Sequence, residues 1–121
     1  MANLIRFGGG ALPPNLVVNA TKSSSTFTDT GYRQGTLTVS VKNEFGNVIA
    51  GLLKIVFSIR AANGTEYSMA GLEGLGWTVT FTGNGDGTYT IAIVSTQTFT
   101  GDWDVIVEGV EVETNLVVTF G

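Results

Sequence analysis

The sequence contains neither cysteine nor histidine. Without cysteine there is no disulfide framework, no thiolate nucleophile and no cysteine-ligated metal centre. Without histidine the commonest general base is missing, and a Ser-His-Asp triad cannot form within this chain. Charged side chains are also scarce, at 13% of residues, which is about half of the roughly 25% that is usual in globular proteins. We therefore expect no enzymatic activity and no cofactor.

Positive charge is particularly sparse. Six lysines and arginines stand against ten aspartates and glutamates, for a net charge of −4. The basic residues are dispersed, whereas nucleic-acid-binding proteins gather them on one surface. The sequence has no apolar run of the roughly 20 residues that a membrane-spanning helix needs, since the longest apolar stretch, 52–59, is broken by Lys54 and Ser58. We expect neither nucleic acid nor a membrane as a partner.

The chain contains 17 glycines and many threonines in place of charged residues. From residue 16 onward, apolar and polar residues alternate with a period of two, which is typical of strands with one buried face. Threonines are expected on the exposed faces. The alternation predicts strands at residues 16–18, 37–41, 52–59, 77–82, 89–93, 103–107 and 116–120.

The segments between these strands have the composition of turns and loops. Residues 43–47, 62–65 and 83–87 are rich in Asn, Gly and Asp, which tolerate positive φ, and 83–87 is the strongest hairpin signal. Residues 20–35 are expected to form an irregular edge or loop, and 97–101 a loop. The glycines of 69–76 predict a loop there too, so little or no helix is expected. Seven or eight short strands with frequent turns indicate an all-β sandwich.

The turn of residues 43–51, NEFGNVIAG, followed by an apolar strand, resembles the bacterial immunoglobulin-like (Ig-like) repeats of the invasin and intimin type. Residues 85–95 and the closing hairpin of residues 101–120 are similar to the later strands of that family. The resemblance covers roughly residues 16–120. It implies an Ig-like β-sandwich of about seven or eight antiparallel strands, used as a spacer, a display platform or an adhesive module. It implies no catalytic residues.

Residues 1–15 differ from the rest of the chain. Three successive glycines at 8–10 and two prolines at 13–14 predict an extended N-terminal arm, followed by a sandwich domain at 16–121. The first residues lack the basic and apolar regions of a secretory signal, which predicts synthesis without export. One interpretation is a frayed terminus without a partner; the other is an arm that docks on a partner, which its large apolar side chains favour. The candidate partner-binding residues of the arm are Leu4, Ile5, Arg6, Phe7 and Leu12.

A free-standing Ig-like chain with such an arm resembles capsid decoration proteins of tailed phages. This resemblance implies a structural virion protein that binds the major capsid protein or another virion protein, either alone or as a homo-oligomer. The alternative is an Ig-like adhesive or carbohydrate-binding module of a tail or cell-surface protein, with cell-surface glycans as partners.

Aromatic residues supply the candidate contacts outside the arm. Phe27, Tyr32, Phe45 and Phe99 are expected in loops or turns, where exposed side chains can contact a partner. Trp77 and Trp103 lie in register with the apolar faces of their strands, which predicts core positions; a sugar-stacking platform is the alternative.

Each group of carboxylates has a structural interpretation and a functional alternative. We expect Asp86, in a hairpin tip, to support its turn, and the pair Asp102 and Asp104 to keep a strand soluble. A Ca²⁺ site is the alternative for these carboxylates. The last hairpin carries Glu108, Glu111 and Glu113, which are expected to form a solvated edge that opposes aggregation. The alternative there is a paired-carboxylate glycosidase site.

Overall fold

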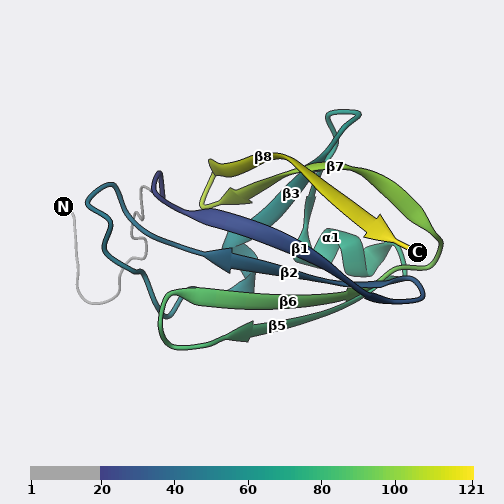
Figure 1. The fold of residues 1–121 in the computed structure, drawn as a ribbon, viewed down its shortest axis with the longest axis horizontal. Coiled ribbons are helices and arrows are strands. Elements are labelled where there is room, and N and C mark those ends of the chain that lie inside the picture. The colour runs from purple at the N-terminus through teal and green to yellow at the C-terminus, as the bar shows by residue number, and fades with distance from the viewer. Residues whose placement is uncertain (1–19) are drawn as a thin grey trace.

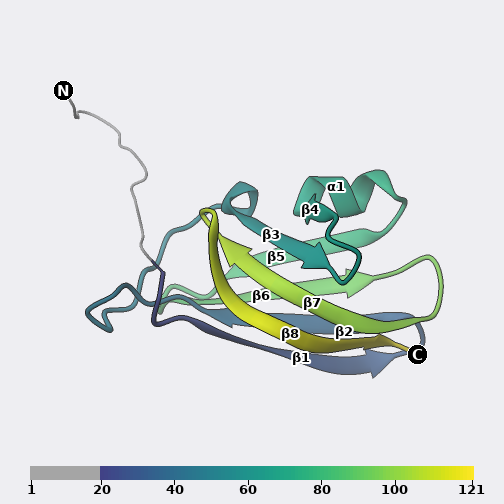
Figure 2. The same cartoon turned by 90° about the horizontal axis from the view of Figure 1, so that it is seen from above.

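The computed structural model describes residues 20–121; the arm and the strand predicted at 16–18 lie outside this part of the chain. Two four-stranded antiparallel sheets pack face to face (Figures 1 and 2). The first sheet has the order β1 (Ser24–Gly31), β2 (Gln34–Ser40), β6 (Thr88–Val94), β5 (Thr78–Gly83). The second has the order β4 (Glu66–Ser68), β3 (Phe57–Ala61), β7 (Phe99–Val107), β8 (Val110–Phe120). The predicted all-β Ig-like sandwich is confirmed.

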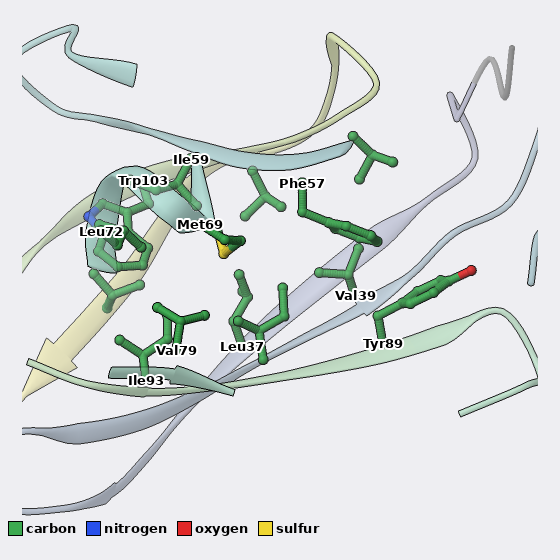
Figure 3. Packing of buried hydrophobic residues seen from close by; sticks show 14 of the residues in the cluster. Leu37, Val39, Phe57, Ile59, Met69, Leu72, Val79, Tyr89, Ile93 and Trp103 are labelled. Atoms are coloured by element: carbon green, nitrogen blue, oxygen red, sulfur yellow. The ribbon is translucent and has the colours of Figure 1, made fainter. Parts of the chain in front are cut away.

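The core lies between the two sheets and follows the predicted alternation (Figure 3). Leu37 and Val39 of β2 are completely buried, while the intervening Thr38 is partly exposed. The exposed side of β5 carries threonines at positions 78, 80 and 82, as expected. Full burial of one such aliphatic side chain contributes about 1.5–3 kcal/mol. The outer sides of β2 and β5 therefore carry mainly hydroxyl groups in place of charges.

A short helix, α1 (Met69–Gly74), replaces the loop predicted for this segment. The hydroxyl of Ser68 caps the helix by accepting a hydrogen bond from the Gly71 amide at 2.9 Å. Met69 and Leu72, three residues apart, are each 1% exposed. Burial of these two side chains against the sheets outweighs the low helix propensity of the glycines. The prediction was wrong because a helix of six residues is too short to show a helical period.

The strand predicted at 52–59 begins only at Phe57. A 3₁₀ turn, η1 (Lys54–Val56), precedes it, and Leu53 and Ile55 are 70% and 81% exposed instead of sharing the buried face of Phe57. The neighbouring strand sets this limit, because Phe57 pairs with Val107, the last residue of β7. The Val56 carbonyl still accepts a hydrogen bond from the Glu108 amide at 2.9 Å, just beyond β7, whereas Leu53 and Ile55 have no partner in β7 and lie exposed.

Two predicted loops contain strands. Much of 20–35 forms β1, which pairs with β2, and β7 already begins within the loop expected at 97–101. At the side where β1 meets β8, the Ser25 amide donates a hydrogen bond to a carboxylate oxygen of Glu113 at 3.1 Å. The rings of Phe27 and Phe120 also meet there, with centroids 5.3 Å apart. Glu113, expected on a solvated edge, thus links the two sheets.

Tyr89 holds the segment that connects β2 of the first sheet to β3 of the second. Its side chain is 1% exposed. Its hydroxyl donates a hydrogen bond to the Ile49 carbonyl at 2.6 Å and accepts one from the Leu52 amide at 3.1 Å. A single phenol therefore satisfies two backbone groups of a segment without regular secondary structure.

Replacing Tyr89 with phenylalanine is expected to lower the free energy of unfolding by about 1–3 kcal/mol, because both backbone groups lose their partner. Urea titration at pH 7 measures this loss.

Burial raises the pKa of the Tyr89 phenol above its ordinary value of 10.0. The native protein should therefore lose stability as the pH rises above about 10, because the unfolded chain releases this proton first. The Tyr89→Phe variant lacks this loss, so the difference in free energy of unfolding between the native protein and the variant should become smaller above about pH 10. A difference that stays constant with pH would contradict the raised pKa of Tyr89.

Candidate functional site

A cavity of about 340 Å³ opens between α1, the turn that joins β3 to β4, and the loop that joins β6 to β7. Its size is within the range of small-molecule sites, about 300–1,000 Å³. The described lining consists of the aromatic residues Tyr67, Trp77, Phe99 and Trp103, the aliphatic residues Ile59, Ala61, Leu72 and Leu75, and the polar residues Asn63, Thr96 and Gln97. None of these residues carries a charge.

The end of α1 places one wall of the cavity. Gly76 has a φ of +92°, a conformation that side chains disfavour, and its amide donates a hydrogen bond to the Glu73 carbonyl at 3.0 Å. The Trp77 amide then donates to the Leu72 carbonyl at 3.3 Å. This tight exit brings Trp77 beside the helix that carries Leu72. Figure 3 shows the Leu72 side chain next to Trp103, and both residues line the cavity.

Three aromatic rings of the lining lie next to one another, one pair stacked and one pair tilted. Trp103 is 2% exposed and lies between Trp77 and Phe99. Its ring centroid is 6.3 Å from that of Trp77, with planes at 25°, and 6.4 Å from that of Phe99, with planes at 32°. The completely buried Phe120 contacts all three rings from behind. The aromatic surface is therefore rigid before any ligand arrives.

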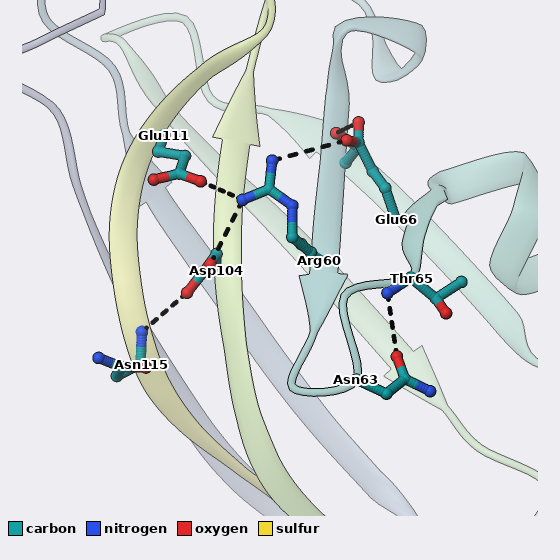
Figure 4. A network of polar contacts seen from close by, with 8 residues as sticks. Arg60, Asn63, Thr65, Glu66, Asp104, Glu111 and Asn115 are labelled. Atoms are coloured by element: carbon teal, nitrogen blue, oxygen red, sulfur yellow. Dashed lines mark hydrogen bonds and ion pairs between the residues drawn. The ribbon is translucent and has the colours of Figure 1, made fainter.

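The polar residues of the lining have side-chain donors and acceptors that bond to no described residue. The Gln97 amide and the Thr96 hydroxyl make no hydrogen bond with any described residue, although the backbone of their loop is fixed. Arg33 fixes it by donating from Nη1 to the Thr96 carbonyl at 3.0 Å. On the opposite turn, the side-chain oxygen of Asn63 accepts from the Thr65 amide at 3.0 Å (Figure 4), so its Nδ2 faces no partner among residues 20–121.

The two tryptophans occupy the core positions predicted for them. Trp103 is buried, and Trp77 is half-buried against Phe120. A core position and a surface that contacts sugars are compatible for these residues, because both rings also line the cavity. The cavity itself was missed: alternation places Trp77 and Trp103 on inward faces, but nothing in the sequence indicates that α1 leaves space beside them.

Two of the four predicted loop contacts are placed differently by the structure. Phe27 lies on β1 and Phe99 at the start of β7, and both are half-buried against the core. The reason is that each ring lies on the inward face of its strand, where it meets Phe120. Tyr32 and Phe45 do lie in turns and are 66% and 79% exposed. A contact role for any of these residues stays a prediction, as does that of the arm residues, which lie outside the described part.

Three acidic side chains of the second sheet gather around one arginine (Figure 4). Arg60 forms ion pairs with Glu66 at 3.8 Å, with Asp104 at 3.5 Å and with Glu111. The hydrogen bond that it donates to Glu111 raises the pKa of the guanidinium. Asp104 also accepts from the Asn115 amide at 3.0 Å. These carboxylates therefore already have a cation, and they form a structural network instead of a ligand site.

Asp86 serves its hairpin, as expected. One oxygen of its carboxylate accepts from the Thr88 amide at 3.0 Å and from the Thr88 hydroxyl at 2.6 Å, which lowers the pKa of the carboxyl group. Within residues 20–121 no three acidic side chains are placed to hold a metal ion. The same part of the chain has no helix with the length and apolar character needed to cross a membrane.

No protein-family model and no curated protein matches this chain. Among solved structures, FdeC, an adhesin of Escherichia coli, matches with a TM-score of 0.54 and 26% sequence identity, over 83% of this chain and 31% of that chain. The filamin domain of Lin-41 matches with a TM-score of 0.50 and 14% identity, over 84% of this chain and 96% of that domain. The second likeness shows the fold alone. The chain is thus an Ig-like β-sandwich, similar to about a third of an adhesin.

Proposed function

We propose that this chain is an adhesive Ig-like domain that acts at a cell surface and needs no catalytic group. The observation that carries the proposal is the likeness to FdeC, which extends over 83% of the chain at 26% identity. Because the chain spans 31% of the FdeC chain, an adhesive role transfers only as a proposal for this domain. The rigid aromatic cavity supports it, since it gives the sandwich a place to hold a partner.

The path of the chain through the sandwich also supports presentation of this cavity. β1 and β8 run side by side in the same direction, so the described chain enters at one end and leaves at the other (Figure 2). Phe99, which lines the cavity, pairs with Phe120 at the exit end. A domain held from its entry side would therefore present the cavity away from its point of attachment.

The capsid-decoration role has less support. It was predicted from the arm at residues 1–15, which lies outside the described residues, and neither FdeC nor the Lin-41 filamin domain is described as a virion protein. The adhesive alternative has a structural neighbour with that role, and we therefore prefer it.

Adhesion can be tested with beads that carry oriented copies of the chain. The sequence has no cysteine, so one cysteine added before Met1 gives a unique attachment point. We expect these beads to remain on epithelial cell layers under flow at least about ten times more often than beads carrying the heat-unfolded chain, because many weak contacts add up. An excess of soluble chain should release them. Equal retention of both kinds of bead on every cell layer tested would refute the proposal.

A further inference from the structure

We propose that the aromatic cavity binds a neutral pyranose ring, the terminal sugar of a cell-surface glycan. This inference rests on the adhesive function and names its ligand. The cavity of about 340 Å³ lies at the small end of the range for ligand sites. It therefore suits a single ring and its linkage better than a long chain of sugars.

The aromatic surface matches one face of such a ring. A pyranose carries C–H groups on its flat faces, and these have a small positive charge, whereas the face of an aromatic ring is negative. Trp77 and Phe99 are only partly buried, so a sugar can contact these two rings, whereas Trp103 is 2% exposed and supports them from between, with its plane at 25° to Trp77 and 32° to Phe99. Because Phe120 packs behind all three, a sugar would meet rings that are already ordered.

The polar groups of the cavity match the edge of a sugar ring. Gln97 can both donate and accept, the Thr96 hydroxyl can do the same, and Asn63 retains its Nδ2 donors. The indole N–H of Trp103 also donates to no described residue, although the side chain is 2% exposed. A purely apolar ligand would leave these groups without partners, whereas sugar hydroxyls supply both donors and acceptors.

Charge selects the neutral class of sugar. None of the described lining residues is a lysine or arginine that could pair with a carboxylate. The whole chain has a net charge of −4, so an acidic sugar would meet weak repulsion and no compensating partner. Sialic and uronic acids should therefore bind more weakly than neutral pyranosides.

Titration of the soluble chain with methyl pyranosides tests the proposal directly. The probes are the methyl glycosides of glucose, galactose, mannose and N-acetylglucosamine, with sialic acid and glucuronate for comparison. At least one neutral glycoside should change the tryptophan emission and shift the side-chain amide signals of Asn63 and Gln97 in NMR spectra. Dissociation constants in the millimolar range are expected for one sugar ring, since 1 mM corresponds to about −4 kcal/mol.

A matched pair of variants separates the cavity from the rest of the surface. Leu75 lines the cavity and is 50% exposed, while Leu53 is 70% exposed and lies outside the described lining. Leu75→Glu should weaken binding at least about tenfold, and Leu53→Glu should change it less than twofold. Gln97→Leu provides a second variant that replaces a polar group without adding charge, with an expected loss of about fivefold. Unchanged thermal unfolding of each variant shows that its fold is intact.

Several results would overturn the inference. One is the absence of any shift at the cavity residues with 100 mM neutral glycoside; another is equal loss of binding in Leu75→Glu and Leu53→Glu. Tighter binding of the acidic sugars would also do so, as would occupation of the cavity by a peptide of residues 1–12 while sugars have no effect. If sugars fail and the beads still adhere, the adhesive function stands without this ligand. If sugars bind and the beads do not adhere, the adhesive function fails instead.

Discussion

Replacing Trp103 with alanine is expected to lower the free energy of unfolding by about 3–5 kcal/mol. The side chain is 2% exposed, and it packs against Trp77, Phe99 and Phe120. Its removal leaves a void that neighbouring rings held by two sheets cannot fill. Because natural domains are stable by only about 5–15 kcal/mol, this loss would leave a large unfolded fraction at moderate temperature.

The loss can be measured by urea titration with the fluorescence of Trp77, the one tryptophan left in the variant. Phe45→Ala is the matched control, because it also removes an aromatic ring but from a turn, where the side chain is 79% exposed. The control should change stability by less than about 0.5 kcal/mol. Similar urea midpoints for the two variants would show that Trp103 is not part of the tightly packed core.

Replacing Gly87 with alanine is expected to lower the free energy of unfolding by about 2–5 kcal/mol. Gly87 has a φ of +89°, and this conformation alone costs a residue with a Cβ about 1–2 kcal/mol. In addition, a Cβ atom here would lie 2.7 Å from the Cβ of Val48 and 3.3 Å from the Ile49 amide nitrogen. Overpacking of this kind adds about 1–3 kcal/mol. The hairpin cannot move aside easily, because the Gly87 carbonyl accepts a hydrogen bond from the Val41 amide at 2.8 Å.

Gly64→Ala is the matched control for this prediction. Gly64 has the same φ of +89°, but a Cβ at this position would have no atom within 4 Å. Its substitution should therefore cost only the backbone strain of about 1–2 kcal/mol. Thermal and urea unfolding of both variants should show the larger loss for Gly87→Ala. Equal losses would mean that Val48 does not pack tightly against Gly87.

Much of the sandwich follows from local pattern. Alternation of apolar and polar residues places Leu37 and Val39 in the core and the threonines of β5 outside it, because successive side chains of a strand point to opposite faces. The same rule predicted that Trp103 would be buried. Turn residues also mark their positions, and Asp86 supports its hairpin through Thr88. These features depend on neighbours in the chain, so a sequence can specify them.

The errors occur where a distant part of the chain decides. Ile55 continues the apolar alternation but is 81% exposed, because β7 offers no residue for it to pair with. Met69 and Leu72 form a helix only because the sheets bury them. Phe27 has the surroundings of a loop residue in the sequence, yet Phe120, at the other end of the chain, covers it.

The sequence by itself determined the fold class, most of the strands and the absence of histidine and cysteine chemistry. These follow from composition and from a period of two, which require no knowledge of tertiary contacts. Only the tertiary structure decided that a cavity exists and which residues line it. Its walls come from α1, from the turn after β3 and from the loop before β7, and the packing of the two sheets brings these three segments together.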